Sequence, residues 1–226
     1  MTGTGPAGAE ARVALVTGAS RGLGAALAEE LARRGWQVIA VARTQGALED
    51  LDDRVRAAGA PGAITLAPAD LTDEGATRAL CRAVQDRWGG IALWAHSAIQ
   101  GAPLSPAASV AGKELDRAIA LNLRATALLI ALIEPLLRAR QGTALFFDDP
   151  RPGSAFAGAY GATKAGQIAL ARAWAQEAAR IGPRVAITEP APMATRLREG
   201  FHPGEDRAPL ALPPDEAARI LDSLAP

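Results

Sequence analysis

A tyrosine and a lysine on one predicted helix face could perform acid–base chemistry. Tyr160 and Lys164 lie in the stretch GAYGATKAGQIALARAWAQEAARIG, which predicts one long helix. Side chains at positions i and i+4 of a helix are neighbours, so the phenol and the ammonium would lie close together. A positive charge beside a phenol favours the phenolate and lowers the phenol pKa from about 10 toward neutrality. Tyr160 could then give its proton to a substrate oxygen.

A glycine-rich turn, TGASRGLG at residues 17–24, could bind a dinucleotide. It directly follows the predicted strand ARVALVTG and opens the predicted helix GLGAALAEELARRG. Its glycines let the backbone turn tightly and approach a pyrophosphate, and the helix N-terminus supplies free N–H groups and partial positive charge. An ordinary strand-to-helix turn is the alternative interpretation.

The end of the second predicted strand indicates which dinucleotide would bind. An acidic residue there binds the ribose 2′-hydroxyl, whereas an arginine accommodates a 2′-phosphate. The strand ends with Arg43 and no carboxylate, and Arg21 in the turn adds a second guanidinium. We therefore expect NADP(H), unless both arginines are solvated surface residues. Asp70 could accept a hydrogen bond from the adenine amine or cap the helix that begins near Asp73.

Alternating strands and helices must position these residues. Short apolar runs, such as ARVALVTG and WQVIAVAR, alternate with helical stretches along the chain. This alternation predicts an α/β fold with a doubly wound, Rossmann-type parallel sheet of six strands. We expect residues 12–226 to form a single domain and residues 1–11 to form a flexible N-terminal arm.

The composition argues against several other classes of protein. Lys plus Arg and Asp plus Glu are balanced at 24 each, so nucleic acid and anionic membranes gain no electrostatic attraction. The single cysteine, Cys81, excludes an intramolecular disulfide, and the two histidines match no zinc spacing. The apolar stretch ATALLIALIEPLL is interrupted by Glu134 and Pro135, so we expect no membrane-spanning helix. The N-terminal residues lack the long apolar core of a signal peptide, which predicts a cytoplasmic protein.

The turn and the Tyr160–Lys164 pair together resemble the motifs of the short-chain dehydrogenase/reductase family. The turn matches the family's Thr-Gly-x-x-x-Gly-x-Gly, and Tyr160-x-x-x-Lys164 matches its catalytic pair. Asn122 matches its catalytic asparagine, and Asp70 matches its adenine-contacting aspartate. The similarity runs from about residue 12 to residue 224. The tail LREGFHPGE is similar to a bacterial oxoacyl-reductase-like subgroup of poorly characterised members.

The resemblance implies a role for each matching residue. Tyr160 would protonate a carbonyl oxygen while hydride arrives from the nicotinamide, and Lys164 would activate Tyr160 and hold the nicotinamide ribose. Asn122 would anchor a water in the proton relay, and Thr195 would meet the nicotinamide carboxamide. The substrate would be a small carbonyl compound or alcohol. The dinucleotide contacts would come from Gly18, Ser20, Arg21, Gly22, Leu23, Gly24, Arg43, Asp70, Leu71, Ala98, Lys164, Pro190 and Thr195.

Position 149 departs from the family pattern. The family's serine, which donates a hydrogen bond to the substrate carbonyl, aligns with Asp149 in the sequence FDDP. An ionised aspartate cannot donate, and it would raise the pKa of Tyr160 and oppose Lys164. A protonated Asp149, kept neutral by burial, could donate. Otherwise both aspartates face elsewhere, with Ser154 or a water in place of the serine, or one aspartate only caps a turn before Pro150.

Other departures lie around the expected cofactor and substrate. His96 replaces a family asparagine and would hydrogen-bond neighbouring strands, and Ile99 replaces a glycine that lets the backbone approach the cofactor. Residues 196–212 read as a loop where family members carry a substrate lid. Phe201 and His202 in this loop would either contact substrate or belong to an ordinary mobile loop.

The predicted quaternary structure follows from the strand count. The chain ends without the family's seventh strand, so subunit pairing through that strand would be missing. A homodimer could instead form through the apolar helices predicted at residues 112–140 and 159–181.

Two functions from different classes follow. The first is an NADP(H)-dependent oxidoreductase that reduces a carbonyl or oxidises an alcohol at an atypical site, favoured by Tyr160, Lys164 and Asn122. The second is a dinucleotide-binding protein without turnover, with a regulatory or partner role, favoured by Asp149 and Ile99. A third hypothesis is an interaction module that uses the sheet edge left by the missing strand.

Overall fold

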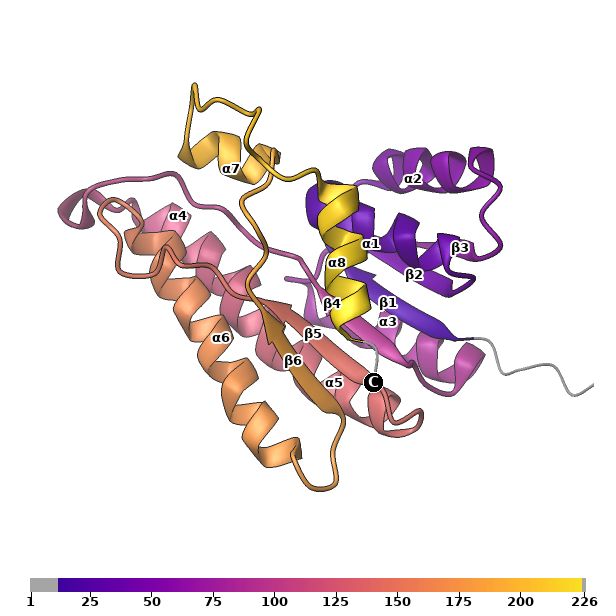
Figure 1. The fold of residues 1–226 in the computed structure, drawn as a ribbon. Helices are drawn as coiled ribbons and strands as arrows, with labels where there is room; N and C mark the ends of the chain where they lie inside the picture. The colour runs from indigo at the N-terminus through magenta and orange to yellow at the C-terminus, as the bar shows by residue number, and fades with distance from the viewer. Residues whose placement is uncertain (1–11, 225–226) are drawn as a thin grey trace, which may run out of the picture.

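Six parallel strands form one sheet in the order β3-β2-β1-β4-β5-β6 (Figure 1). The computed structural model describes residues 12–224, so the predicted arm at residues 1–11 lies outside the described residues. The strands are Val13–Thr17 (β1), Gln37–Ala42 (β2), Ala63–Pro68 (β3), Leu93–His96 (β4), Thr143–Phe147 (β5) and Arg184–Thr188 (β6). The strand order reverses between β1 and β4, which confirms the predicted doubly wound α/β sheet.

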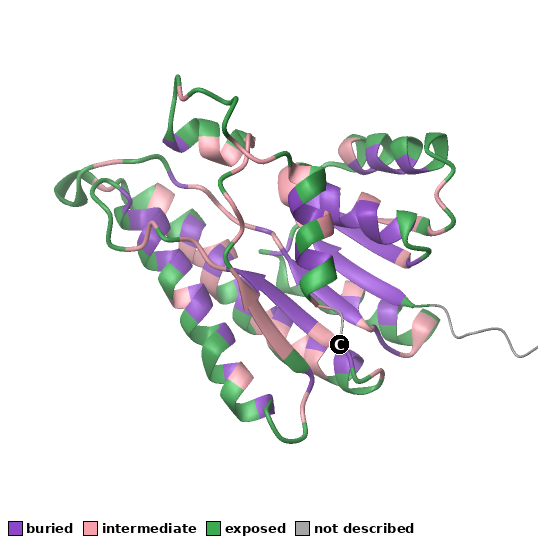
Figure 2. Cartoon of the chain, in the orientation of Figure 1, coloured by how far each residue is buried: buried purple, intermediate pink, exposed green. Residues whose placement is uncertain are grey.

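Helices cover both faces of this sheet (Figure 1). One face carries α1 (Gly22–Arg33), α2 (Gln45–Ala57) and α8 (Pro213–Ser223). The other face carries α3 (Glu74–Trp88), α5 (Thr126–Arg138) and α6 (Gly158–Ala178). In β1, the side chains of Ala14 and Val16 belong to the core under α1, α2 and α8, whereas those of Val13 and Leu15 belong to the core under α3, α5 and α6. Because both faces are covered, the central strands are buried throughout, as Figure 2 shows in purple.

The chain from residue 112 to residue 138 is one long helical segment. It consists of α4 (Gly112–Ala118), a π-helical part η2 (Ile119–Ala125) and α5. Its 27 residues, with a mean hydropathy of 1.6 in the most apolar window, are long and apolar enough to cross a membrane by length and composition. The expectation that Glu134 and Pro135 interrupt this run was wrong, because the helix continues through both residues. In the fold, α5 packs on β4 and α3, and α4 packs on α6.

A short helix, α7 (Arg196–Phe201), lies in the segment that was predicted to be a loop. The hydroxyl oxygen of Thr195 caps it by accepting a hydrogen bond from the backbone N–H of Arg198 at 3.3 Å. The sequence prediction missed this helix because six residues are too few to establish an apolar period. In the described part of the chain no strand follows β6, so β6 and β3 are the two edges of the sheet.

Candidate active site

A cavity of ≈ 1280 Å³ opens at the carboxyl ends of the strands. Parallel sheets bind ligands at this edge, beside the point where the strand order reverses. The walls come from the β1–α1 turn, the ends of β2 and β4, the β5–α6 loop, α6 and the segment after β6. All the sequence-predicted site residues except Asn122 line this cavity: Gly18, Ser20, Arg21, Gly22, Leu23, Gly24, Arg43, Asp70, Leu71, Ala98, Asp149, Tyr160, Lys164, Pro190 and Thr195.

The glycine-rich turn leaves the start of α1 open to the cavity. A Cβ atom on Gly18 would lie 2.6 Å from the Ala98 nitrogen, and one on Gly24 would lie 2.3 Å from the Gly18 oxygen. These glycines therefore allow the turn to pack against the end of β4. Among the described residues, no side chain caps the first turn of α1, and that turn holds no acidic residue. Its unpaired N–H groups and the positive end of the helix dipole suit a pyrophosphate.

The far end of the cavity carries positive charge beside Asp70. Arg21 and Arg43 are both exposed and both line the cavity. Asp70 accepts hydrogen bonds from the backbone N–H and the hydroxyl of Thr72 at 2.9 and 2.7 Å. Burial acts to raise the pKa of Asp70, but these hydrogen bonds and the charge of Arg43 outweigh it and lower the pKa. Asp73, not Asp70, caps α3 by accepting a hydrogen bond from Ala76 at 3.0 Å.

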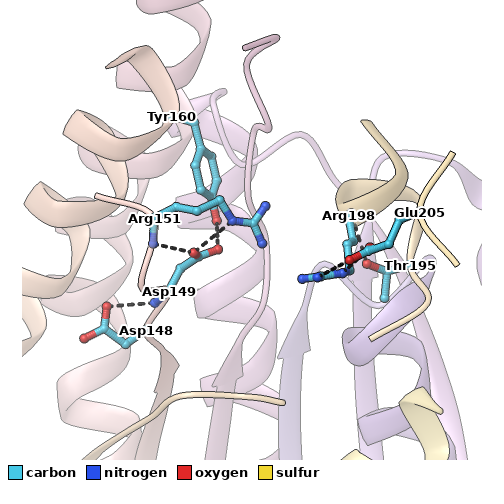
Figure 3. A network of polar contacts seen from close by, with 7 residues as sticks. All are labelled: Asp148, Asp149, Arg151, Tyr160, Thr195, Arg198 and Glu205. Atoms are coloured by element: carbon cyan, nitrogen blue, oxygen red, sulfur yellow. Dashed lines mark hydrogen bonds and ion pairs between the residues drawn. The ribbon is translucent and has the colours of Figure 1, made fainter. Parts of the chain in front are cut away.

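The reactive end of the cavity is built around Asp149. The hydroxyl of Tyr160 donates a hydrogen bond to Asp149 Oδ2 at 2.8 Å (Figure 3). Asp149 Oδ1 accepts hydrogen bonds from the backbone N–H and the Nε of Arg151 at 2.9 and 3.2 Å. Asp148 turns away and binds Arg172 at 2.9 Å. Both aspartates line the cavity, but only Asp149, at the position where the family serine was expected, contacts the Tyr160 hydroxyl.

The protonation of Tyr160 differs from the expectation based on Lys164. Burial, and then the charge and hydrogen bond of Asp149, raise the pKa of Tyr160 above its usual value. The predicted lowering of the pKa by Lys164 was wrong for this arrangement. The ammonium of Lys164 donates to Gln167 Oε1 at 2.7 Å, and burial lowers the pKa of Lys164 to about 8 against the opposing charges of Asp149 and Asp148. Tyr160 is therefore held protonated, with its proton directed at a carboxylate.

Asn122 lies beneath the cavity, not in its wall. It is fully buried in the π-helical segment η2. Its Oδ1 accepts a hydrogen bond from the backbone N–H of Gln100 at 2.7 Å, and its Nδ2 donates to the Gln100 carbonyl at 3.1 Å and to Thr163 at 2.9 Å. The side chain thus ties the segment after β4 to α6, next to Tyr160 and Lys164.

A buried hydrogen-bonded chain connects Lys164 to the glycine-rich turn. Gln167 Nε2 donates to the hydroxyl of Thr126 at 3.1 Å, and that hydroxyl lies 2.9 Å from His96 Nε2. His96 Nδ1 lies 2.8 Å from the hydroxyl of Thr17, the first residue of the turn. His96 thus hydrogen-bonds to a neighbouring strand, as the sequence predicted.

This chain fixes the protonation state of His96. Thr126 donates its only hydroxyl proton to the Asn122 carbonyl at 2.9 Å, so His96 Nε2 must carry the proton shared with Thr126. Burial, and to a lesser degree the charge of Lys164, lower the pKa of His96 to about 3. The sequence analysis missed Gln167 and Thr126. The signal for Gln167 was its position three residues after Lys164, on the same helix face.

An apolar cluster closes the site on the substrate side. The ring of Phe201 in α7 packs on Tyr160 with centroids 4.8 Å apart, and Ile99 packs against the same cluster. Tyr160 is only 2% exposed as a result. Ile99 also lines the cavity and so borders it together with Tyr160. His202, the other predicted contact of this segment, does not line this cavity but a smaller recess next to it.

Comparisons with known proteins identify relatives of the chain by sequence and by fold. A match to the mouse (Mus musculus) dehydrogenase/reductase SDR family member 11 is 37% identical over 92 residues, covering 41% of this chain and only 35% of that relative's length. The 3-oxoacyl-(acyl-carrier-protein) reductase FabG of Vibrio cholerae is 30% identical over 94% of this chain and 85% of its own length. The crystal structure of a metagenomic short-chain oxidoreductase in complex with NADP superposes with a TM-score of 0.77 at 28% identity, covering 95% of this chain and 91% of that one.

The family comparison covers most of the chain. The model of the short chain dehydrogenase family matches residues 12–206, from the start of β1 to the residues after α7. The matched region contains the glycine-rich turn, Asn122, Tyr160 and Lys164. The chain therefore belongs to the short-chain dehydrogenase/reductase family.

Proposed function

We propose that this protein is an NADP(H)-dependent oxidoreductase that reduces a small carbonyl compound at an atypical site. The observation that supports it best is one continuous cavity, which runs from the uncapped start of α1 to Tyr160 and Lys164. The bound dinucleotide supplies the hydride. Arg21 and Arg43, with no carboxylate at the end of β2, favour NADP(H) over NAD(H).

In this proposal Tyr160 is the proton donor. Hydride addition turns a carbonyl into an alkoxide, which is a stronger base than a phenolate, so the proton moves from Tyr160 to the substrate oxygen despite the raised pKa of the phenol. The substrate oxygen takes the place of Asp149 Oδ2 as the acceptor of the Tyr160 hydroxyl. Lys164 then returns a proton to the phenolate, because its own pKa of about 8 is far lower than that of the phenol. The raised pKa leaves almost no Tyr160 phenolate near neutral pH to accept a proton from an alcohol, so the proposal favours reduction of a carbonyl over oxidation of an alcohol.

Asn122 and Gln167 have positioning roles in the proposal. Asn122 holds the backbone of Gln100, which lines the cavity, and Gln167 orients the ammonium of Lys164. Asp149 orients the hydroxyl of Tyr160 and fixes Arg151 beside it. We further propose that residues 12–226 act as a single cytoplasmic domain that forms a homodimer through the helices of residues 112–138 and α6.

Tyr160→Phe tests this function. We expect the variant to lose NADPH oxidation with carbonyl substrates by at least about 100-fold, because the proton donor is gone. Calorimetric titration should give the same affinity for NADPH as the wild type, because the phenol is not among the predicted cofactor contacts. Turnover that survives in Tyr160→Phe would exclude the proposed mechanism.

A second candidate is a dinucleotide-binding protein without turnover. The observation that favours it is the contact between Tyr160 and Asp149, which engages the hydroxyl proton within a closed cluster. Asp149→Ser distinguishes the two functions in the NADPH oxidation assay. Turnover in the wild type that falls in the variant supports the reductase, whereas turnover that appears only in the variant supports the binding protein.

A further inference from the structure

Arg151 carries a hydrogen-bond donor that the protein does not satisfy. Its side chain is directed to Asp149 through Nε at 3.2 Å. Its Nη1 is buried and has no hydrogen-bond partner among the described residues. Buried donors in folded proteins are nearly always paired with protein, water or ligand, so Nη1 indicates an acceptor that the chain itself does not supply.

The position of this guanidinium is fixed relative to Tyr160. Asp149 accepts from Arg151 with one oxygen and from the Tyr160 hydroxyl with the other, so a single carboxylate separates the two groups. Arg151 Cζ lies 4.6 Å from the centroid of the Phe201 ring. The centroids of the Phe201 and Tyr160 rings are 4.8 Å apart. An acceptor bound at the outer edge of Arg151 would therefore belong to the molecule that reacts at Tyr160.

A second guanidinium faces the same space. Arg198 at the start of α7 makes two hydrogen bonds of 2.6 Å to Glu205, and Figure 3 shows its guanidinium extending toward Arg151. The hydrogen bonds and charge of Arg198 lower the pKa of Glu205, and the charge of Arg151 lowers it further. The Arg151–Asp149 and Arg198–Glu205 ion pairs therefore lie close enough to interact. Both arginines line the cavity that contains Tyr160.

The charges at this end favour an anion. Asp149 and Glu205 each offset one of the two arginines, and Arg172 offsets Asp148. Among these groups Lys164 then leaves one positive charge in excess. A guanidinium has five N–H donors in a fork that matches a carboxylate, and Asp149 uses only the Nε donor of Arg151. The outer edge of the fork thus remains for a second carboxylate.

We propose that the substrate is an oxo acid whose carboxylate binds Arg151, with Arg198 on its other side. This inference rests on the proposed reductase function and names its substrate class. Hydride from NADPH adds to the carbonyl carbon, the proton of Tyr160 adds to the carbonyl oxygen, and the products are a hydroxy acid and NADP⁺. Phe201 stacks on the Arg151 guanidinium, so binding of the acid would require Phe201 to shift.

Acetoacetate and methyl acetoacetate test the inference as a matched pair, with pyruvate and methyl pyruvate as a shorter pair. NADPH oxidation by the wild type should show a kcat/KM at least about tenfold higher for each acid than for its ester. Arg151→Leu should lower kcat/KM for the acids at least about tenfold more than for the esters, which are affected only by the change at Asp149 and Tyr160. Arg151→Lys should recover part of the loss, since it keeps the charge but not the fork.

Arg172→Leu is the matched control. Arg172 pairs with the neighbouring Asp148 at 2.9 Å, is mostly exposed and does not line the cavity. The Arg172→Leu substitution should leave the ratio of kcat/KM for acid over ester unchanged. An equal loss for acids and esters in Arg151→Leu would mean that Arg151 only positions Asp149, and an ester preference in the wild type would mean that the acid does not bind there. Either result overturns the inference.

A binding measurement separates failure of this inference from failure of the proposed function. Calorimetric titration of acetoacetate into wild-type protein saturated with NADP⁺ should give binding that is lost in Arg151→Leu. Reduction of neutral ketones without acid binding would leave the reductase intact and overturn the oxo acid. Acid binding that depends on Arg151 without any NADPH oxidation would overturn the reductase and retain the anion site.

Discussion

The contact between Tyr160 and Asp149 sets the acid–base behaviour of the site at the scale of single residues. The carboxylate accepts the phenol proton at 2.8 Å and raises the pKa of Tyr160 beyond the effect of burial. The same negative charge acts in the opposite direction on Lys164, whose pKa it raises toward the usual value while burial lowers it to about 8. Asp149 thus favours the protonated forms of both Tyr160 and Lys164, adding to burial at Tyr160 and opposing it at Lys164.

This coupling predicts how carbonyl reduction depends on pH. Lys164 is charged below its pKa, so kcat should fall as the pH rises through about 8. In Asp149→Asn the charge that raises the pKa of Lys164 is absent, and the fall should move to lower pH by about one unit. The pH profile of NADPH oxidation, recorded for the wild type and for Asp149→Asn, measures the fall and its displacement. Asp148→Asn is the control: the charge of Asp148 affects the pKa of Lys164 less than that of Asp149 does, so this variant should shift the pH profile less. A profile of Asp149→Asn that does not move, or that moves to higher pH, would contradict the coupling.

Gln167 is the residue whose loss should most affect the buried polar chain. Gln167→Leu removes the acceptor of Lys164 and the donor to Thr126 while keeping a similar volume. We expect the free energy of unfolding in urea to fall by about 1–3 kcal/mol, since buried polar partners are left unpaired. Gln45→Leu is the control, because Gln45 makes a comparable hydrogen bond to Glu49 on the surface, and it should change stability by less than about 0.5 kcal/mol. Equal effects of the two changes would contradict the role of the buried chain.

The elements around the site were predicted from the sequence to different extents. The strands and long helices follow from their apolar patterns, and the glycine-rich turn was found because it joins a strand to a helix. The π-helical turn around Asn122 was not predicted, because it has no separate apolar period. The orientations of Asp148 and Asp149 were not predicted either, since adjacent carboxylates differ only in which one the β5–α6 loop directs inward. The Lys164–Gln167 contact arises from burial of one helix face, which sequence spacing allows but does not require.

The turn that opens α1 gives a prediction for an element. In Gly24→Ala the new Cβ would lie 2.3 Å from the Gly18 oxygen, so the turn must distort. We expect a lower melting temperature and a loss of NADPH affinity of at least about tenfold in calorimetric titration. Gly46→Ala in α2 is the control, because a Cβ there meets nothing within 4 Å and replacing a helical glycine stabilises by up to about 1 kcal/mol. NADPH affinity that survives in Gly24→Ala would mean that the turn does not hold the pyrophosphate.

At the scale of the whole molecule, the cavity joins segments from both halves of the chain. Residues after β1, β2, β4, β5 and β6 all line it. A ligand that binds there stabilises the entire fold, because unfolding any part of the sheet disrupts the site.

Thermal unfolding should therefore report cofactor choice. NADPH at about 100 times its Kd adds about 2.7 kcal/mol, which corresponds to a rise in melting temperature of about 5–10 °C. NADH at the same concentration should give a smaller rise in melting temperature. Arg43→Ala should bring the rise with NADPH closer to the rise with NADH. Arg78→Ala on the exposed surface of α3 is the control and should keep the wild-type difference. Equal shifts with both dinucleotides in the wild type would contradict the preference for NADPH.

The packing of Gly18 against Ala98 has a consequence for the order in which the protein is made. The ribosome releases β1 first, but the glycine-rich turn reaches its final shape only when β4 has emerged and paired with β1. Tyr160 and Lys164 follow β4 by more than sixty residues and are synthesised later. The nascent chain can therefore pair β1 with β4 and shape the glycine-rich turn before Tyr160 and Lys164 are made, so the two ends of the cavity are separated in time as well as in sequence.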